Sequence, residues 1–159
     1  MLLMNKKLSP AIFALILICF FLPFVTVSCE KRVIVKLTGI QLAVGTNIEK
    51  PSLFIGEFDQ EKFPPEPLAT TAFICGFVGL ATSFLKLKKK AIIPAIMGLI
   101  GAILLWLLKV KIAREALIKG EGFLGITYEF GFWLSFALFA IAAIFNTWIF
   151  FSKPPNKEI

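Results

Sequence analysis

The chain has 159 residues, of which 58% are hydrophobic; it contains 18 Phe and no His, and its formal net charge is +7. This composition is far more apolar than that of a soluble domain, so it predicts an integral membrane protein. The absence of His excludes haem ligation by His and most kinds of zinc site.

The positive charge is concentrated in three short segments. Residues 1–7, 86–90 and 152–159 hold eight Lys and one Glu, a net of +7, whereas the rest of the chain is balanced. An excess of Lys near membrane-spanning ends keeps a segment on the cytoplasmic side. We therefore interpret the basicity as an orientation signal with some attraction for anionic lipid head groups, and we do not expect a nucleic-acid partner.

The first apolar segment, residues 8–27, has 20 residues without a charge. As a helix it would be ~30 Å long, the hydrocarbon thickness of a bilayer. Ser9 and Pro10 suit its first turn, and Pro23 is expected to kink or end it near the outer surface.

An alternative interpretation is a lipoprotein signal that ends at Cys29. The order of Lys6 and Lys7, an apolar run and then Thr26 to Cys29 loosely resembles such a signal. The run is longer than the 7–15 residues typical of a signal peptide, and three further spans make a lipid anchor redundant. Cys29 is thus a possible external thiol, with a free thiol, an intermolecular disulfide and lipid attachment all left open.

Residues 29–66 form the largest polar segment, with five basic and six acidic residues, as expected for an external loop. Val33, Val35 and Leu37 recur at every second position, which predicts a half-buried strand. Residues 40–44 are expected to be either the return strand or one helical turn. Because of its prolines and Gly56, the segment 52–66 is expected to be a loop over the membrane surface.

Two further spans, 68–85 and 91–108, flank a cytoplasmic hinge at 86–90. The hinge lysines are the main topology determinants: Lys86, Lys88, Lys89 and Lys90. Both spans carry small residues four positions apart, which allow close packing of membrane helices. These pairs are Ala72 with Gly76, Gly79 with Ser83, Ala91 with Ala95, and Gly98 with Ala102. We expect them to pack within one bundle rather than to mediate homodimerisation.

The third helix is expected to continue beyond the membrane through residues 109–119, which contain good helix formers and no breaker before Gly120. Val110, Ala113 and Leu117 would form an apolar stripe on this extension. Residues 123–127 are short enough for an added strand in the second external loop, 109–127. The fourth span, 128–151, has Trp133 and Trp148 near opposite ends as interfacial anchors.

The predicted fold is therefore an all-α membrane protein: a four-transmembrane-helix bundle with a small extracytoplasmic β-containing subdomain and both termini inside. An isolated two-stranded hairpin is only marginally stable, so the external strand should need support from other elements. We expect Val33, Val35 and Leu37 to pack on Phe123, Ile126 and the stripe that includes Leu117.

Four spans, a strand-containing first loop, an extended third helix and Glu129-Phe130-Gly131 before the fourth span resemble claudin-like tetraspan membrane proteins. The first loop has no Trp and only Cys29, so the resemblance implies neither the loop disulfide nor junction formation. Leu22-Pro23-Phe24-Val25-Thr26-Val27-Ser28-Cys29 and Thr38-Gly39-Ile40-Gln41-Leu42-Ala43 also resemble uncharacterised small bacterial four-helix inner-membrane proteins, a likeness that implies no activity.

Chemical motifs are missing from the sequence. The predicted spans hold no Asp, Lys, Arg or His, and Glu129 lies at an interface, which disfavours ion-coupled transporters and proton pumps. There is no phosphate-binding loop, no nucleophile elbow and no C-x-x-C pair. Cys19 and Cys75 are expected to be buried small hydrophobes. We therefore predict no catalytic, cofactor-binding or metal site.

The expected function is that of an accessory, scaffolding or interaction protein of the bacterial cytoplasmic (inner) membrane, not an enzyme. It would need no cofactor, and its partners would be the bilayer and a membrane protein or further copies of the chain. The alternative is a small-solute or lipid carrier or channel, which a polar central cavity would favour. A membrane enzyme is the third possibility.

Overall fold

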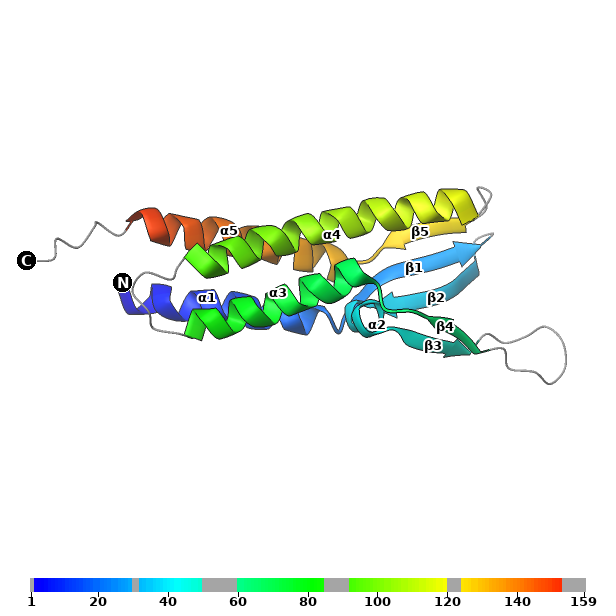
Figure 1. Ribbon diagram of the computed structural model, residues 1–159, viewed down its shortest axis with the longest axis horizontal. Helices are drawn as coiled ribbons and strands as arrows, with labels where there is room; N and C mark the ends of the chain where they lie inside the picture. The colour runs from blue at the N-terminus through cyan, green and yellow to red at the C-terminus, as the bar shows by residue number, and fades with distance from the viewer. Residues whose placement is uncertain (1, 30–31, 50–59, 85–91, 120–123, 153–159) are drawn as a thin grey trace, which may run out of the picture.

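The computed structural model describes residues 2–29, 32–49, 60–84, 92–119 and 124–152. The chain is mostly helical, and a small sheet lies at one end of the helices (Figure 1). Its elements in chain order are α1 (Leu2–Cys19), β1 (Pro23–Cys29), β2 (Arg32–Thr38), α2 (Gly39–Val44), β3 (Thr46–Glu49), β4 (Gln60–Phe63), α3 (Pro67–Phe84), α4 (Ile92–Lys119), β5 (Leu124–Tyr128) and α5 (Phe130–Ser152).

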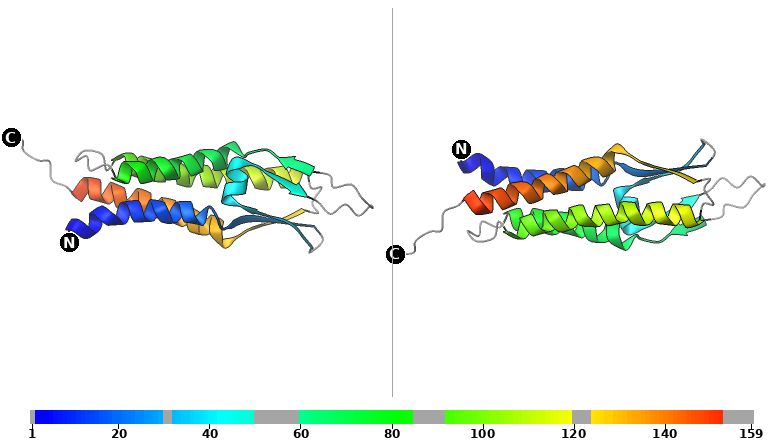
Figure 2. Two further views of the ribbon diagram at one scale, coloured as in Figure 1. Left: turned by 90° about the horizontal axis from the view of Figure 1, so that it is seen from below. Right: turned by 90° about the horizontal axis from the view of Figure 1, so that it is seen from above.

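The four long helices form an antiparallel bundle. Helix α1 packs on α3 and α5, and α4 packs on the same two helices, so that the four make a closed ring. The start of α1, the end of α3, the start of α4 and the end of α5 lie together at one end of the bundle (Figure 1). All the strands lie at the opposite end (Figure 2).

The outer surface of the bundle is apolar, as expected for helices that face lipid. Helices α3, α4 and α5 are each long and apolar enough to cross a membrane. Large apolar side chains point outward along them, including Phe77, Leu99, Ile103, Ile144 and Trp148. Soluble monomers rarely expose apolar patches of this extent. The chain is therefore a helical membrane protein.

Small residues let the helices approach closely. The position that a Cβ of Gly79 would occupy on α3 is already filled by the ring of Phe13 on α1. A Cβ at Gly98 on α4 would lie 2.8 Å from the backbone nitrogen of Ala143 on α5. Gly79 and Gly98, expected to be packing positions, thus make contacts inside the bundle. Ala91, another of the expected packing residues, lies outside the described residues.

The structure corrects the expected first span. Helix α1 ends at Cys19, and the rest of the apolar run forms a turn and then β1. The apolar part of α1, Leu8–Cys19, is shorter than the other three long helices. The run looked like one helix because a buried central strand is as apolar as a membrane span. The β-branched Val25, Thr26 and Val27 are typical of a strand.

The sheet has the strand order β2-β1-β5, and both pairs are antiparallel. Strand β2 covers the predicted strand at Val33–Leu37, and β5 covers the described part of the expected strand at 123–127. The central strand β1 supplies the support that a lone strand would lack. It also ties the segment that follows α1 to the residues just before α5.

A second, two-stranded sheet corrects the expected loop at 52–66. Residues 60–63 form β4 and pair with β3, while 50–59 lie outside the described residues. Between the two sheets, residues 39–44 form the helical turn α2, one of the two expected alternatives. Thr38 and Gln41 close a capping box at its start, and Gly45 ends it with a positive φ of 84°.

Helix α4 is continuous to Lys119, as expected for an extended third helix. Its 28 residues are about 42 Å long, whereas the hydrocarbon core of a bilayer is about 30 Å thick. The excess lies at the sheet end, where the helix carries its charged residues (Figure 1). The expected stripe is partly corrected, because Ala113 is exposed and Ile112 packs on the core instead.

Candidate functional site

The sheet carries two rows of apolar residues on one face. Val27 on β1 is paired with Val35 on β2 and with Ile126 on β5, so these three side chains form one row across the sheet. The next row consists of Leu37, Val25 and Tyr128. Val25 and Leu37 are buried, and Val27 and Ile126 pack on the core of the bundle.

These rows place Val35, Leu37 and Ile126, named from the sequence, on one face, with β1 between them. Phe123 lies outside the described residues, as do the side chains of Val33, Leu117 and Cys29. The hinge residues Lys86, Lys88, Lys89 and Lys90 also lie outside them. Cys19 and Cys75 are free and buried, as their places in the apolar segments predict.

Aromatic rings join the sheet to the bundle. The ring centroid of Phe24 lies 5.0 Å from that of Phe20 and 5.9 Å from that of Phe132. The rings of Phe24 and Phe132 meet edge to face. Gly39 permits this packing, because a Cβ there would come within 2.8 Å of the Phe24 ring. Gly131, at the start of α5, similarly leaves room for the backbone carbonyl of Pro23.

Two hydrogen bonds of Glu129 cross the same junction. The hydroxyl of Thr26 donates a hydrogen bond of 2.8 Å to Oε1 of Glu129, and the backbone N–H of Glu129 donates to the carbonyl of Phe24. Glu129 thus holds the first turn of α5 against β1. The Glu129 carboxylate is engaged by the Thr26 hydroxyl and has a structural role.

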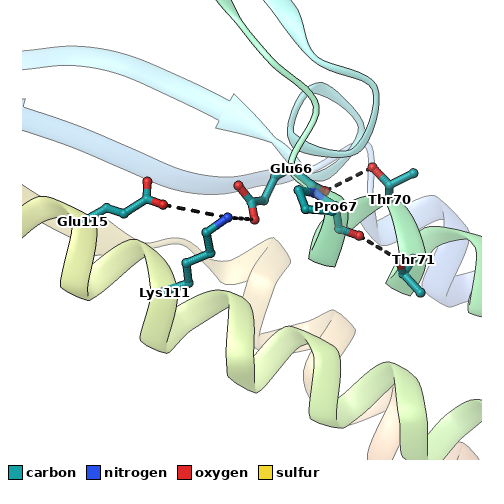
Figure 3. A network of polar contacts seen from close by, with 6 residues as sticks. All are labelled: Glu66, Pro67, Thr70, Thr71, Lys111 and Glu115. Atoms are coloured by element: carbon teal, nitrogen blue, oxygen red, sulfur yellow. Dashed lines mark hydrogen bonds and ion pairs between the residues drawn. The ribbon is translucent and has the colours of Figure 1, made fainter.

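A polar network fixes the extension of α4 to the start of α3 (Figure 3). Nζ of Lys111 donates a hydrogen bond of 2.6 Å to Oε1 of Glu66 and lies 3.8 Å from Oε1 of Glu115. The backbone N–H of Glu66 donates to the carbonyl of Leu42 on α2, and the hydroxyl of Thr70 donates to the carbonyl of Ala43. The network therefore connects α2, α3 and α4 at one level.

Aromatic rings surround a second lysine of α4. Nζ of Lys109 lies 4.7 Å from the ring centroid of Trp133, 5.1 Å from that of Trp106 and 5.7 Å from that of Tyr128. The Tyr128 hydroxyl donates to the backbone carbonyl of Lys109 at 2.8 Å. Burial raises the pKa of Tyr128 above its ordinary value.

At the opposite end of the bundle, three polar side chains meet between three helices. The hydroxyl of Ser9 on α1 donates to Oδ1 of Asn146 on α5 at 2.8 Å and lies 3.0 Å from the hydroxyl of Ser83 on α3. Asn146 is buried and donates to the carbonyl of Ala142. Hydrogen bonds of this kind hold membrane helices together.

Sequence reasoning did not single out the Ser9–Ser83–Asn146 cluster or the rings around Lys109. The sequence contains a pattern that points to each of these two features. Asn146 is the one carboxamide in the segment 128–151, and Lys109 follows Trp106 by three residues, which is helical spacing. What the spacing does not reveal is the partner on the neighbouring helix.

No group of three or more His, Cys, Asp and Glu side chains in the described ranges is arranged to hold a metal ion. The polar side chains described above bond chiefly to each other and to the backbone. Their arrangement fixes the relative positions of helices and strands. The resulting site is an end surface built from β1, β2, β5, α2 and the extension of α4.

Comparison of the chain with protein-family models, with curated proteins and with solved structures finds no match.

Proposed function

We propose that the protein is an accessory or scaffolding protein of the bacterial cytoplasmic membrane, and that it binds a membrane-protein partner through its sheet end. The observation that supports this proposal is that α4 runs unbroken from the bundle into that end and is held there from two sides. Lys111 is bound by Glu66, and the carbonyl of Lys109 is bound by Tyr128. A partner at the sheet end would therefore meet a surface that is rigidly fixed to the bundle.

The proposed orientation places this surface outside the cytoplasm. The lysine-rich segment 86–90 connects the end of α3 to the start of α4, at the end of the bundle that is remote from the strands. By the positive-inside rule, that end faces the cytoplasm. Both termini then lie inside, and the sheets project from the external face.

The competing proposal is a carrier or channel for a small solute or lipid, followed by a membrane enzyme. A carrier needs polar groups that are free to meet a substrate inside the bundle. Ser9, Ser83 and Asn146 bond to one another or to the backbone, which favours a structural role for them, whereas the buried hydroxyl of Ser135 has no partner among the described residues. We also propose a likeness to claudin-like tetraspan proteins. It belongs to the accessory-protein proposal, and it depends on the order of helices and strands alone.

Site-specific photo-crosslinking in intact cells tests the proposal. A photoreactive residue is placed at Lys36 or Thr127, which are exposed on the sheet, and in a matched control at Ile144, which is exposed on the bundle. We expect a discrete adduct of one defined size from the sheet positions and none of that size from Ile144. Mild purification should recover the same partner.

Recovery of the protein alone, as a monomer, from both experiments would contradict the accessory role. An adduct of twice the mass of the chain would identify the partner as a second copy.

A further inference from the structure

We propose that Lys109, together with Trp106 and Trp133, forms a binding site for the phosphate head group of an anionic phospholipid. The three side chains come from two adjacent helices, α4 and α5, and meet on the outer surface of the bundle. Trp106 is 50% exposed and Trp133 is 44% exposed, so both border the space that lipid occupies. The site lies at the start of the α4 extension, next to the proposed partner surface, and lipid binding there does not require a partner.

The charge of Lys109 is the first argument. Among the residues that the structure describes, Lys109 forms no ion pair, whereas Lys111, two residues further along the same helix, is engaged by Glu66 and Glu115. The ring faces attract the Lys109 ammonium but do not neutralise it. They hold it in one place, which lowers the entropic cost of binding an anion there.

The depth of Lys109 in the membrane is the second argument. It lies 17 residues after Ile92, the first residue of α4, which corresponds to about 26 Å along the helix. With Ile92 at the near edge of a hydrocarbon core about 30 Å thick, the ammonium lies close to the far edge, within reach of the head-group layer. Tryptophan side chains prefer this interfacial level as well.

Hydrogen-bonding capacity is the third argument. The Tyr128 hydroxyl is already used by the Lys109 carbonyl. In the described part of the chain, neither indole N–H of Trp106 and Trp133 has a protein acceptor, so both are free to donate to a lipid head group. An ammonium and two N–H donors match a phosphodiester, whereas the zwitterionic head group of phosphatidylcholine brings a competing cation.

Native mass spectrometry of the full chain with phosphatidylglycerol and phosphatidylcholine of equal chain length tests the site. We expect Lys109 to increase the retention of phosphatidylglycerol relative to phosphatidylcholine about fivefold. One lysine near an anionic lipid surface provides an attraction of this size. Lys109→Gln should reduce the preference about fivefold, to the level that the remaining basic residues provide. Lys36→Gln, which removes the same charge from an exposed position on β2, and Lys109→Arg should both keep it.

A second measurement does not require any change at the site. In a Trp148→Phe background, brominated phosphatidylglycerol in a mixed bilayer should quench fluorescence more than brominated phosphatidylcholine at the same fraction. Equal retention and equal quenching by the two lipids would overturn the proposal. So would a preference for phosphatidylglycerol that is as large in Lys109→Gln as in wild type, in a protein with unchanged thermal unfolding.

Discussion

Nζ of Lys111 on α4 lies 2.6 Å from Oε1 of Glu66, which directly precedes α3. This ion pair connects the part of α4 beyond the bundle to the segment that leaves the β3–β4 sheet. Both side chains are partly exposed, at 40% and 21%. Because solvent screens the two charges, the ion pair adds little to the free energy of unfolding. Its main effect is to position α4.

Glu66→Gln should lower the free energy of unfolding by no more than about 1 kcal/mol, because solvent screens a pair of this exposure. Thermal unfolding in a mild detergent, followed by tryptophan fluorescence, measures the change. Glu115→Gln is the matched control, since its carboxylate is 3.8 Å from the same Nζ and half exposed. Equal losses for the two variants would show that the short contact with Glu66 has no special role.

Asn146→Leu should destabilise the bundle by about 1 kcal/mol, the usual size of a hydrogen bond between membrane helices. The substitution removes the carboxamide that accepts from the Ser9 hydroxyl and leaves Ser83 as the remaining partner of that buried group. Unfolding in increasing concentrations of a denaturing detergent measures the loss. Thr147→Val, at the exposed neighbouring position, should change little. A stability of Asn146→Leu equal to wild type would argue against a structural role for the cluster.

Gly79→Leu should separate α1 from α3, because even a Cβ at this position collides with the ring of Phe13. Overpacking of this kind costs about 1–3 kcal/mol. The same denaturing-detergent titration measures it, with Ala81→Leu on an exposed face of α3 as the control. If Ala81→Leu is the more damaging variant, the observed contact between α1 and α3 is incorrect.

Val35→Asp should loosen the sheet while the bundle stays inserted. Val35 lies beside Val27 in the apolar row, and a charge placed there costs several kcal/mol before relaxation. Limited proteolysis from the external side should cut the variant faster between Arg32 and Lys62 than it cuts wild type. Lys36→Asp, at the exposed neighbouring position on β2, should remain resistant. Wild type that is cut as readily as Val35→Asp would show that this segment is not packed.

The sequence predicted the helices best where apolar runs are bounded by charge or proline. Pro67 opens α3 as expected, and the absence of a breaker before Gly120 correctly indicated the extension of α4. Strand β1 was missed for a physical reason: Pro23–Val27 continues an apolar run, and hydropathy alone does not separate a buried strand from a membrane helix.

The remaining differences arise from contacts between distant segments. Residues 60–63 contain Gln, Glu and Lys and show no clear strand pattern, and they become a strand only by pairing with β3. The aromatic surroundings of Lys109 likewise depend on how α5 and β5 lie beside α4. Such partners are set by tertiary packing, which local periodicity does not encode.

The arrangement of the chain across the membrane is the central claim, and single-cysteine labelling in intact cells tests it most directly. In a background that lacks Cys19, Cys29 and Cys75, one cysteine at a time replaces one of five residues, and a membrane-impermeant thiol reagent is added from outside. The positions are Lys7, Lys89, Asn156, Asp59 and Glu121.

We predict that the cysteines at Lys7, Lys89 and Asn156 react only after the membrane is permeabilised, because the lysine-rich segments keep them inside. Those at Asp59 and Glu121 should react in intact cells. Labelling of the cysteine at Lys89 from outside, with protection of the one at Glu121, would contradict the proposed orientation and the external position of the sheet.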